Sequence, residues 1–240
     1  MMRIKLFSIP NLLTLANLLC GALGVVAALA VGDLTVAFGL MVAAAVFDFF
    51  DGFAARLLGQ SGPLGEQLDS LADDISFGLL PAAVLFVLYD RMPGYWLPDW
   101  AAAAVFVVAG CAALRLAKFN IDQTQHAEFC GLPSPAAALF CASLGLLSEC
   151  RGLVLSREAV VAIAFGAGWL MISDVRMFAL KFKGFGWRGN ELRYSFLGLS
   201  ALLVVVLHAW AVPAIIVLYV LLSVGRGLTG GPGAGPNTEK

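Results

Sequence analysis

Charged residues are scarce in this chain of 240 residues. Asp, Glu, Lys and Arg make up only 13% of it, whereas a soluble domain carries about 25%. Apolar residues make up 60%, and apolar runs long enough to span a bilayer recur from one end to the other. The composition excludes an ordinary soluble domain and predicts an all-α polytopic membrane protein.

Histidine is rare in this chain, and its cysteines do not form a metal-binding motif. The two histidines, His126 and His208, lie far apart in the sequence, so we do not expect a metal or catalytic site built on histidine. No two cysteines form a C-x-x-C pair, and we interpret them as small buried hydrophobic residues. The five cysteines are Cys20, Cys111, Cys130, Cys141 and Cys150.

Glycine, proline and charged residues divide the apolar sequence into a predicted bundle of about eight transmembrane helices. The last two predicted spans form one long apolar stretch, in which His208 and Pro213 indicate a tight hairpin. Residues 1–226 form one predicted transmembrane domain, and the Gly- and Pro-rich tail 227–240 is predicted to be disordered. The spans are 9–31, 34–57, 66–89, 98–118, 133–149, 157–173, 194–208 and 210–225.

The N-terminus also has features of a secretory signal peptide, with basic residues before an apolar run. That run is long enough to span a bilayer and leads straight into another apolar segment, which favours a transmembrane helix. With eight spans, one side of the membrane receives twelve of the Lys and Arg residues and the other side three. The positive-inside rule then places both termini, and the turn after Arg56, on the cytoplasmic side of the inner membrane.

Four aspartates stand out in the apolar sequence. Asp48 and Asp51 are spaced i, i+3 and so share one face of a helix, and Asp69 and Asp73 are spaced i, i+4 on the next helix. Residues 60–65 between them read as a turn, so a helical hairpin would bring the two acidic faces together. A charged residue at the centre of a membrane helix costs roughly 2.5–3.5 kcal/mol, so these carboxylates need partners.

A divalent metal site that handles phosphate is the function this pattern favours. Oxygen ligands suit Mg²⁺ or Mn²⁺ rather than zinc, and two such ions about 4 Å apart could grip a pyrophosphate. Gly52 and Ala55 leave room for a ligand, and Arg56 could bind a phosphate. The alternatives are a proton relay and a cation-coupled transporter, but a transporter predicts a symmetric second half that the sequence lacks.

The pattern Asp-x-x-Asp-Gly-x-x-Ala-Arg-x8-Gly-x3-Asp-x3-Asp resembles the signature of the CDP-alcohol phosphatidyltransferase family. The resemblance implies a multi-helix membrane enzyme, commonly a homodimer, that moves a phosphatidyl group from a CDP-linked lipid to an alcohol and releases CMP. We expect membrane lipids, and no nucleic acid, as further partners. The matching positions are Asp48, Asp51, Gly52, Ala55, Arg56, Gly65, Asp69 and Asp73.

Segments 9–17, 68–82, 113–120 and 131–135 are similar to the serine-specific branch of this family, which implies CDP-diacylglycerol and L-serine as substrates. Glycerol 3-phosphate, inositol or its phosphate, and choline remain alternative acceptors. The resemblance assigns metal binding to Asp48, Asp51, Asp69 and Asp73, and makes Asp73 the general base.

The resemblance also implies contacts with the substrates. Capping of the first helix is the alternative role for Asn11 and Thr14, and anchoring at the membrane surface is the alternative role for Arg115 and Lys118. The predicted CDP site consists of Asn11, Thr14, Gly52, Ala55 and Arg56. The residues predicted to hold the lipid phosphate or the serine carboxylate are Arg115, Lys118 and Asn120.

Overall fold

The computed structural model describes residues 6–121, 129–178, 186 and 190–228, and it confirms the all-α class. Two π-helical segments, η1 (Ala27–Val31) and η2 (Asp74–Leu79), and two 3-10 segments, η3 (Asp99–Phe106) and η4 (His208–Trp210), adjoin the α-helices. Strands β1 (Phe129–Cys130) and β2 (Arg176–Met177) pair antiparallel. Within the described ranges the α-helices are α1 (Ile9–Val26), α2 (Leu34–Leu58), α3 (Pro63–Asp73), α4 (Leu80–Arg91), α5 (Val107–Ile121), α6 (Ser134–Arg151), α7 (Arg157–Ile172), α8 (Glu191–Leu207) and α9 (Ala211–Leu228).

Helices occupy all eight predicted spans, and five stretches are long and apolar enough to cross a membrane. The chain is therefore a multi-pass membrane protein by length and composition. Helices α6 and α7 fall outside these five stretches, and α8 and α9 share one of them, so the count of eight spans stays a prediction. The five stretches are Ile9–Val31, Leu34–Leu58, Pro63–Arg91, Asp99–Ile121 and Glu191–Arg226.

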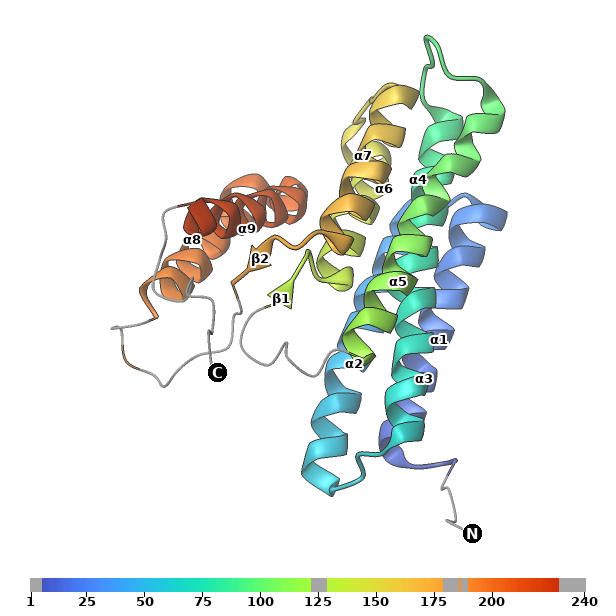
Figure 1. Ribbon diagram of the computed structural model, residues 1–240. Helices are drawn as coiled ribbons and strands as arrows, with labels where there is room; N and C mark the ends of the chain where they lie inside the picture. The colour runs from blue at the N-terminus through green and yellow to red at the C-terminus, as the bar shows by residue number, and fades with distance from the viewer. Residues whose placement is uncertain (1–5, 122–128, 179–185, 187–189, 229–240) are drawn as a thin grey trace.

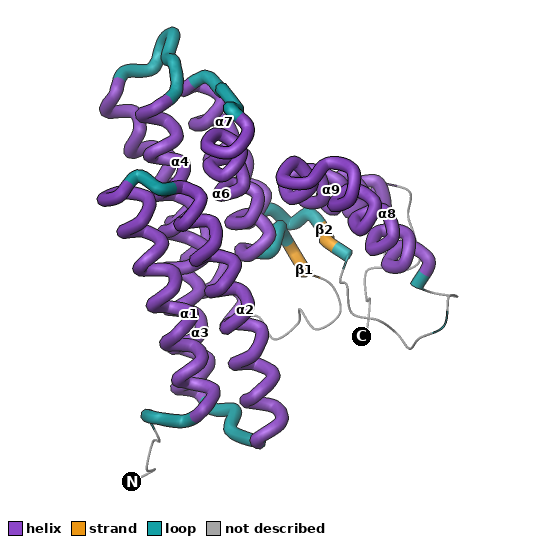
Figure 2. Tube along the Cα trace, turned by 180° about the vertical axis from the view of Figure 1, so that it is seen from behind, coloured by secondary structure: helices purple, strands orange, loops and turns teal. Residues whose placement is uncertain are grey.

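Helices α1 to α7 form an elongated bundle, and the α8–α9 pair lies to one side of it (Figure 1). The turn between α2 and α3 lies at the same end of the bundle as the start of α1, and the loop between α4 and η3 lies at the opposite end (Figure 2). Helix α9 contacts α6, which joins the outer pair to the bundle. The two ends of the bundle therefore bring together residues that are far apart in the sequence.

The predicted break between α8 and α9 is confirmed. His208 has a φ of 52°, and this left-handed conformation ends α8 at Leu207. Helix α9 then begins at Ala211 and runs to Leu228, so it includes the first two residues of the predicted tail. Residues 229–240 lie outside the described residues, as do His126 and most of the basic loop before α8.

The sequence explains the α2–α3 hairpin locally. Gly59 ends α2 with a φ of 61°, a conformation that a residue with a Cβ adopts reluctantly. Pro63 opens α3 at its first position, where its missing N–H is not needed. Residues 60–62 join the helices, and the acidic faces of α2 and α3 lie on either side of this turn.

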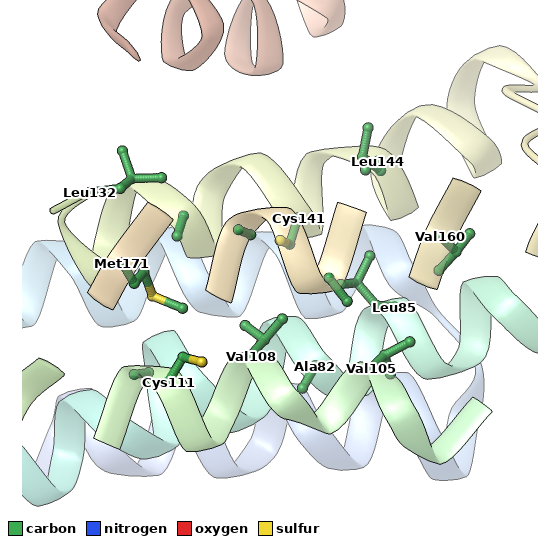
Figure 3. Packing of buried hydrophobic residues seen from close by; sticks show 14 of the residues in the cluster. Ala82, Leu85, Val105, Val108, Cys111, Leu132, Cys141, Leu144, Val160 and Met171 are labelled. Carbon is green, nitrogen blue, oxygen red and sulfur yellow. The ribbon is translucent and has the colours of Figure 1, made fainter. Parts of the chain in front are cut away.

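Small residues let the helices approach closely. Gly21 of α1 lies against Ser76 of η2, where an added Cβ would be 2.3 Å from Ser76 Oγ and 2.9 Å from its Cα. The core between the helices is rich in alanine, including fully buried Ala82 and Ala164. Figure 3 shows larger side chains such as Leu85 and Val108 filling the space between α4, α5 and α7. Close packing of small residues is the usual basis of helix association in membranes.

Candidate active site

The α2–α3 hairpin brings three of the predicted metal ligands together. One carboxylate oxygen from each of Asp48, Asp51 and Asp69 lies within 4.8 Å of the others. Asp51 is buried, and Asp48 and Asp69 are partly buried. No described Lys or Arg forms an ion pair with any of the three. These carboxylates therefore repel one another unless a cation lies among them.

Asp73 extends this cluster by one helical turn of α3. Its Oδ1 accepts a hydrogen bond of 3.0 Å from Asn17 Nδ2, and its carboxylate interacts electrostatically with that of Asp48. The four aspartates predicted from the sequence thus form one continuous group, which we call the acidic cluster. It lies on the parts of α2 and α3 that adjoin the turn between these two helices.

Helix α1 supplies two polar contacts to the acidic cluster. Thr14 Oγ1 donates a 2.6 Å hydrogen bond to Asp51 Oδ2, and Asn17 donates to Asp73. Ser76 Oγ in turn donates to the backbone oxygen of Asn17 at 3.1 Å. Asn17 was not among the predicted site residues. Its signal was the row Asn11, Thr14 and Asn17, which are spaced three residues apart on one face of a largely apolar helix.

The acidic cluster fits a hard divalent cation. Asp69 Oδ1 and Asn17 Oδ1 are buried, and neither accepts a hydrogen bond from the part of the chain that the structure describes. Buried polar oxygens without a partner are rare unless a ligand, ion or water supplies one. Carboxylate oxygens at this spacing are the ligands that Mg²⁺, Mn²⁺ or Ca²⁺ prefer. The cluster could therefore hold a metal ion.

An open pocket lies beside the acidic cluster between α1, α2 and α3. Asp51 and Asp69 form part of its wall. At Gly52 an added Cβ would meet only Arg56 Nη1, at 3.7 Å, so the space over this glycine is open. All five residues predicted for the CDP site line this pocket, namely Asn11, Thr14, Gly52, Ala55 and Arg56.

The start of α1 shows whether Asn11 and Thr14 cap the helix or line the pocket. Ser8 caps the helix, because its side chain accepts a hydrogen bond from the backbone N–H of Asn11. The Asn11 side chain instead donates to the backbone oxygen of Leu6 at 2.9 Å and lines the pocket. Thr14 lines the same pocket while it donates to Asp51. Neither side chain acts as the helix cap.

A second pocket lies at the end of α5, and Arg115 and Lys118 line it with Cys130 and Ser173. We call it the cationic pocket. Arg115 also interacts electrostatically with Asp73, which links this pocket to the acidic cluster. Lys118 Nζ forms an exposed ion pair of 3.3 Å with Asp174 Oδ1.

Asn120, the third residue predicted here, lies elsewhere. Its Nδ2 donates to Ser70 Oγ of α3 at 2.8 Å, and it lines neither pocket. The structure thus brings Arg115 and Lys118 together and leaves Asn120 as a link between α5 and α3.

The segment before α6 holds Arg115 in place. Gly131 has a φ of 79°, and an added Cβ would be 2.3 Å from the backbone oxygen of Met171, so only glycine fits there. The Gly131 N–H donates to Val175 O at 2.9 Å, which ties this segment to the end of α7. Ser134 then accepts a 3.0 Å hydrogen bond from Arg115 Nη1, while the buried Nε has no partner among the described residues.

Comparison with known proteins identifies the family. Residues 7–173 match the CDP-alcohol phosphatidyltransferase family. The CDP-diacylglycerol–serine O-phosphatidyltransferase of Bacillus subtilis is 34% identical over 168 residues, which are 70% of this chain and 88% of the relative. The protein of the same name from Methanocaldococcus jannaschii is 33% identical over 172 residues, covering 72% of this chain and 74% of that protein.

A mycobacterial relative matches a shorter part of this chain. The CDP-diacylglycerol–serine O-phosphatidyltransferase of Mycobacterium leprae is 38% identical over 141 residues, which are 55% of this chain. This chain spans 40% of the length of that relative. The family match includes all four aspartates, both helices that carry them and both polar pockets, but not α8 or α9. The chain belongs to the CDP-alcohol phosphatidyltransferase family.

Proposed function

We propose that this protein transfers the phosphatidyl group of CDP-diacylglycerol to the hydroxyl of L-serine, giving phosphatidylserine and CMP. The observation that carries the proposal is the place of the acidic cluster: Asp51 and Asp69 line one polar pocket, and Asp73 interacts electrostatically with Arg115 of the other. The relatives named for this reaction, in a bacillus and an archaeon, support serine as the acceptor.

We assign the metal ions and the CDP moiety to different groups of site residues. Asp48, Asp51, Asp69 and Asp73 would hold Mg²⁺ or Mn²⁺, two ions per site, and such ions neutralise a pyrophosphate and the departing phosphate when bound. The open pocket between α1, α2 and α3 holds the CDP moiety, with Gly52 leaving space for it. Arg56 lines this pocket and supplies the positive charge that binds a phosphate.

Asp73 acts as the general base. The seryl oxygen forms a bond to the phosphorus that carries diacylglycerol, the bond from this phosphorus to the CMP oxygen breaks, and the seryl proton passes to Asp73. A carboxylate is a weak base for an alcohol, so the reaction depends on holding the hydroxyl beside it. Asn17 donates to Asp73 Oδ1 and so orients the carboxylate. Arg115 and Lys118 bind the lipid phosphate or the serine carboxylate.

The proposed setting is the inner membrane of the cell. Eight spans would place both termini and the acidic cluster on the cytoplasmic side, where the excess of Lys and Arg lies. CMP is then released on that side. The resemblance to the family supports a homodimer.

Release of CMP by the purified protein in detergent tests the proposal. Serine, glycerol 3-phosphate, inositol phosphate and choline are each added with CDP-diacylglycerol and Mn²⁺ or Mg²⁺, with and without EDTA. We expect release that requires serine, is blocked by EDTA and falls about 10²–10⁴-fold in Asp73→Asn. Asp90→Asn is the matched control, because Asp90 is exposed on α4 away from the cluster.

Release of CMP with a different alcohol would support the proposed metal site but would overturn serine as the acceptor. A phosphorylated acceptor is the second candidate, since the unpartnered Nε of Arg115 and the nearby Lys118 could bind its phosphate. No release with any acceptor, from protein that is folded, would overturn the transferase itself.

A further inference from the structure

One wall of the cationic pocket belongs to a short β-ladder. Cys130 of β1 lines the pocket, and it lies opposite Arg176 of β2. The two strands lie between the bundle and the α8–α9 pair (Figure 1 and Figure 2). Each strand has only two residues, and a two-stranded ladder is marginally stable at best by itself. Other parts of the chain must therefore hold this wall beside Arg115.

Three buried aromatic side chains join the ladder to the outer helices. Phe178 directly follows β2, Phe196 lies on α8 and Tyr219 lies on α9. The ring centroid of Phe178 lies 4.9 Å from that of Tyr219 and 5.6 Å from that of Phe196. The rings of Phe196 and Tyr219 are 5.9 Å apart. Aromatic rings at these separations attract one another, so the three rings connect β2 with both outer helices.

The Tyr219 hydroxyl fixes the backbone at the end of β2. Its O–H donates a buried hydrogen bond of 3.0 Å to Phe178 O. A phenol oxygen that donates its proton keeps lone pairs that attract a positive charge. Tyr219 also interacts electrostatically with Arg115. One hydroxyl group therefore holds the ladder behind the cationic pocket and attracts the arginine that lines this pocket.

Arg115 depends on its surroundings for its orientation. A guanidinium has five N–H donors, and Ser134 Oγ accepts from Nη1 at 3.0 Å. The buried Nε has no partner among the described residues. The side chain thus keeps donors for the anionic group of a ligand. Its direction depends on Ser134 and on the electrostatic attraction of Asp73 and Tyr219.

We propose that Tyr219 is a positioning residue for the cationic pocket: its hydroxyl holds the β1–β2 ladder and orients Arg115 toward the anionic group of the substrate. This role rests on the proposed function, in which Arg115 binds the lipid phosphate or the serine carboxylate. Tyr219 lies on α9, beyond residues 7–173, the part of the chain that matches the family. The C-terminal helices thus contribute to substrate binding, although none of their described residues lines the cationic pocket.

Tyr89 provides a matched control at the opposite end of the bundle. It is fully buried, and its hydroxyl donates to the backbone oxygen of Pro98 at 2.8 Å. Tyr89→Phe therefore removes the same kind of hydrogen bond as Tyr219→Phe, at a position that lines neither polar pocket. A loss of stability from a missing tyrosine hydroxyl should occur in both variants, whereas a loss of substrate binding should occur in Tyr219→Phe alone.

The kinetic experiment measures KM and kcat for CDP-diacylglycerol and for serine. Arg115→Lys identifies the substrate that the cationic pocket holds, because KM for this substrate should rise. Tyr219→Phe should raise KM for the same substrate about tenfold, as expected when a buried backbone acceptor loses its donor. It should leave kcat and the other KM close to those of the wild type. Tyr89→Phe should leave both KM values unchanged.

The double variant Arg115→Lys with Tyr219→Phe separates positioning from a general structural role. If Tyr219 acts through Arg115, Tyr219→Phe should raise KM by less than about twofold once Arg115 has been replaced. Effects of the two substitutions that multiply in KM would overturn the proposal. An equal rise of KM in Tyr219→Phe and Tyr89→Phe would overturn it as well.

Alkylation of Cys130 tests the ladder without turnover. Cys130 is partly buried on β1, so N-ethylmaleimide should reach it faster when the ladder opens. Mass spectrometry of the labelled peptides gives its rate separately from those of the other cysteines. We expect this rate to rise about tenfold in Tyr219→Phe and to stay at the wild-type value in Tyr89→Phe. That result would support the role of Tyr219 even if the wild type released no CMP, which would overturn the proposed function alone. An unchanged rate in Tyr219→Phe would overturn the role of Tyr219.

Discussion

Both ends of the bundle hold carboxylates, but the carboxylates differ in whether a described Lys or Arg pairs with them. At one end, Asp48, Asp51 and Asp69 lie within 4.8 Å of one another and form no ion pair with a described Lys or Arg. At the other, Arg91 Nη1 lies 3.0 Å from Glu149 Oε1, and Arg157 Nη1 lies 2.5 Å from an Asp99 oxygen. We call this second region the paired end.

At the paired end, carboxylates also satisfy backbone groups. Glu149 of α6 accepts hydrogen bonds from the backbone N–H of Leu34 at 3.0 Å and from that of Thr35 at 2.8 Å. These N–H groups open α2, so the carboxylate of another helix caps it and meets the positive end of its dipole. Glu158 likewise accepts from the backbone N–H groups of Tyr95 and Trp96.

The difference separates structural from functional carboxylates. A carboxylate whose partners come from the chain fixes helices to one another, and it contributes stability. A cluster of carboxylates without cationic partners costs stability, and it gains this stability back only from a ligand. The paired end also presents Tyr95, Trp96 and Trp100, all exposed, on the loop before and within η3, and aromatic residues of this kind are typical of a membrane interface.

Removal of divalent cations should have the largest effect and should act on the acidic cluster alone. We expect EDTA to reduce CMP release to background and Mn²⁺ or Mg²⁺ to restore it. Bound metal should also raise the free energy of unfolding, by about 2.7 kcal/mol at a concentration one hundred times Kd. Thermal unfolding in detergent with and without metal measures this. Asp69→Asn should abolish the metal-dependent shift, and a shift that persists in this variant would place the metal elsewhere.

Asn17→Ala should have the next largest effect. The variant removes the hydrogen bond to Asp73 Oδ1 and leaves the four carboxylates in place, so we expect activity to fall about 10–100-fold, as when partners of metal ligands are lost. Steady-state CMP release at saturating serine measures this loss. Leu19→Ala on the same helix is the control, since Leu19 is exposed. Equal activity in the two variants would mean that Asn17 has no role in orienting Asp73.

The acidic cluster and its pocket could be predicted from the sequence because their geometry is local. The i, i+3 and i, i+4 spacings fix which aspartates share a face, and the turn at 60–62 makes the two faces meet. Gly52, Ala55 and Arg56 follow on the same helix, so their place in the pocket follows from the helical repeat. A short connection between two helices leaves few arrangements open.

Contacts between distant segments could not be predicted in this way. Asn17 meets Asp73 across 56 positions, and Glu149 meets Leu34 across 115. Helical periodicity gives the face on which a residue lies but not the helix that packs against it. Gly21 approaches Ser76 closely, and Ser76 lies in the π-helical segment η2. The regular α-helical repeat does not predict where such a segment begins.

Glu149→Ala tests the paired end. The variant leaves the backbone N–H groups of Leu34 and Thr35 without their acceptor, so we expect a loss of roughly 1–3 kcal/mol in the free energy of unfolding. Activity of the folded protein should stay close to that of the wild type, which is the reverse of the pattern in Asn17→Ala. Chemical denaturation in detergent measures the loss, with Asp90→Ala as the exposed control. Lost activity without lost stability would contradict the division between the two ends.

Asp99→Asn should have the smallest effect, because not every pair at the paired end contributes equally. The Asp99 side chain is 84% exposed, and exposed ion pairs contribute about 0–1 kcal/mol. Arg157 keeps its other contacts in this variant: its Nε donates to Met92 O at 3.1 Å, and its guanidinium lies 5.1 Å from the centre of the Tyr89 ring. Denaturation at low salt and at about 1 M salt, where the Debye length falls to 3 Å, measures the contribution of the charge. The wild type should lose its small advantage at high salt, whereas Glu149→Ala should stay destabilised, since the unpaired backbone N–H groups of α2 do not depend on ionic strength. A destabilisation of Asp99→Asn as large as that of Glu149→Ala would mean that ion pairs, and not the capping of α2, hold this end together.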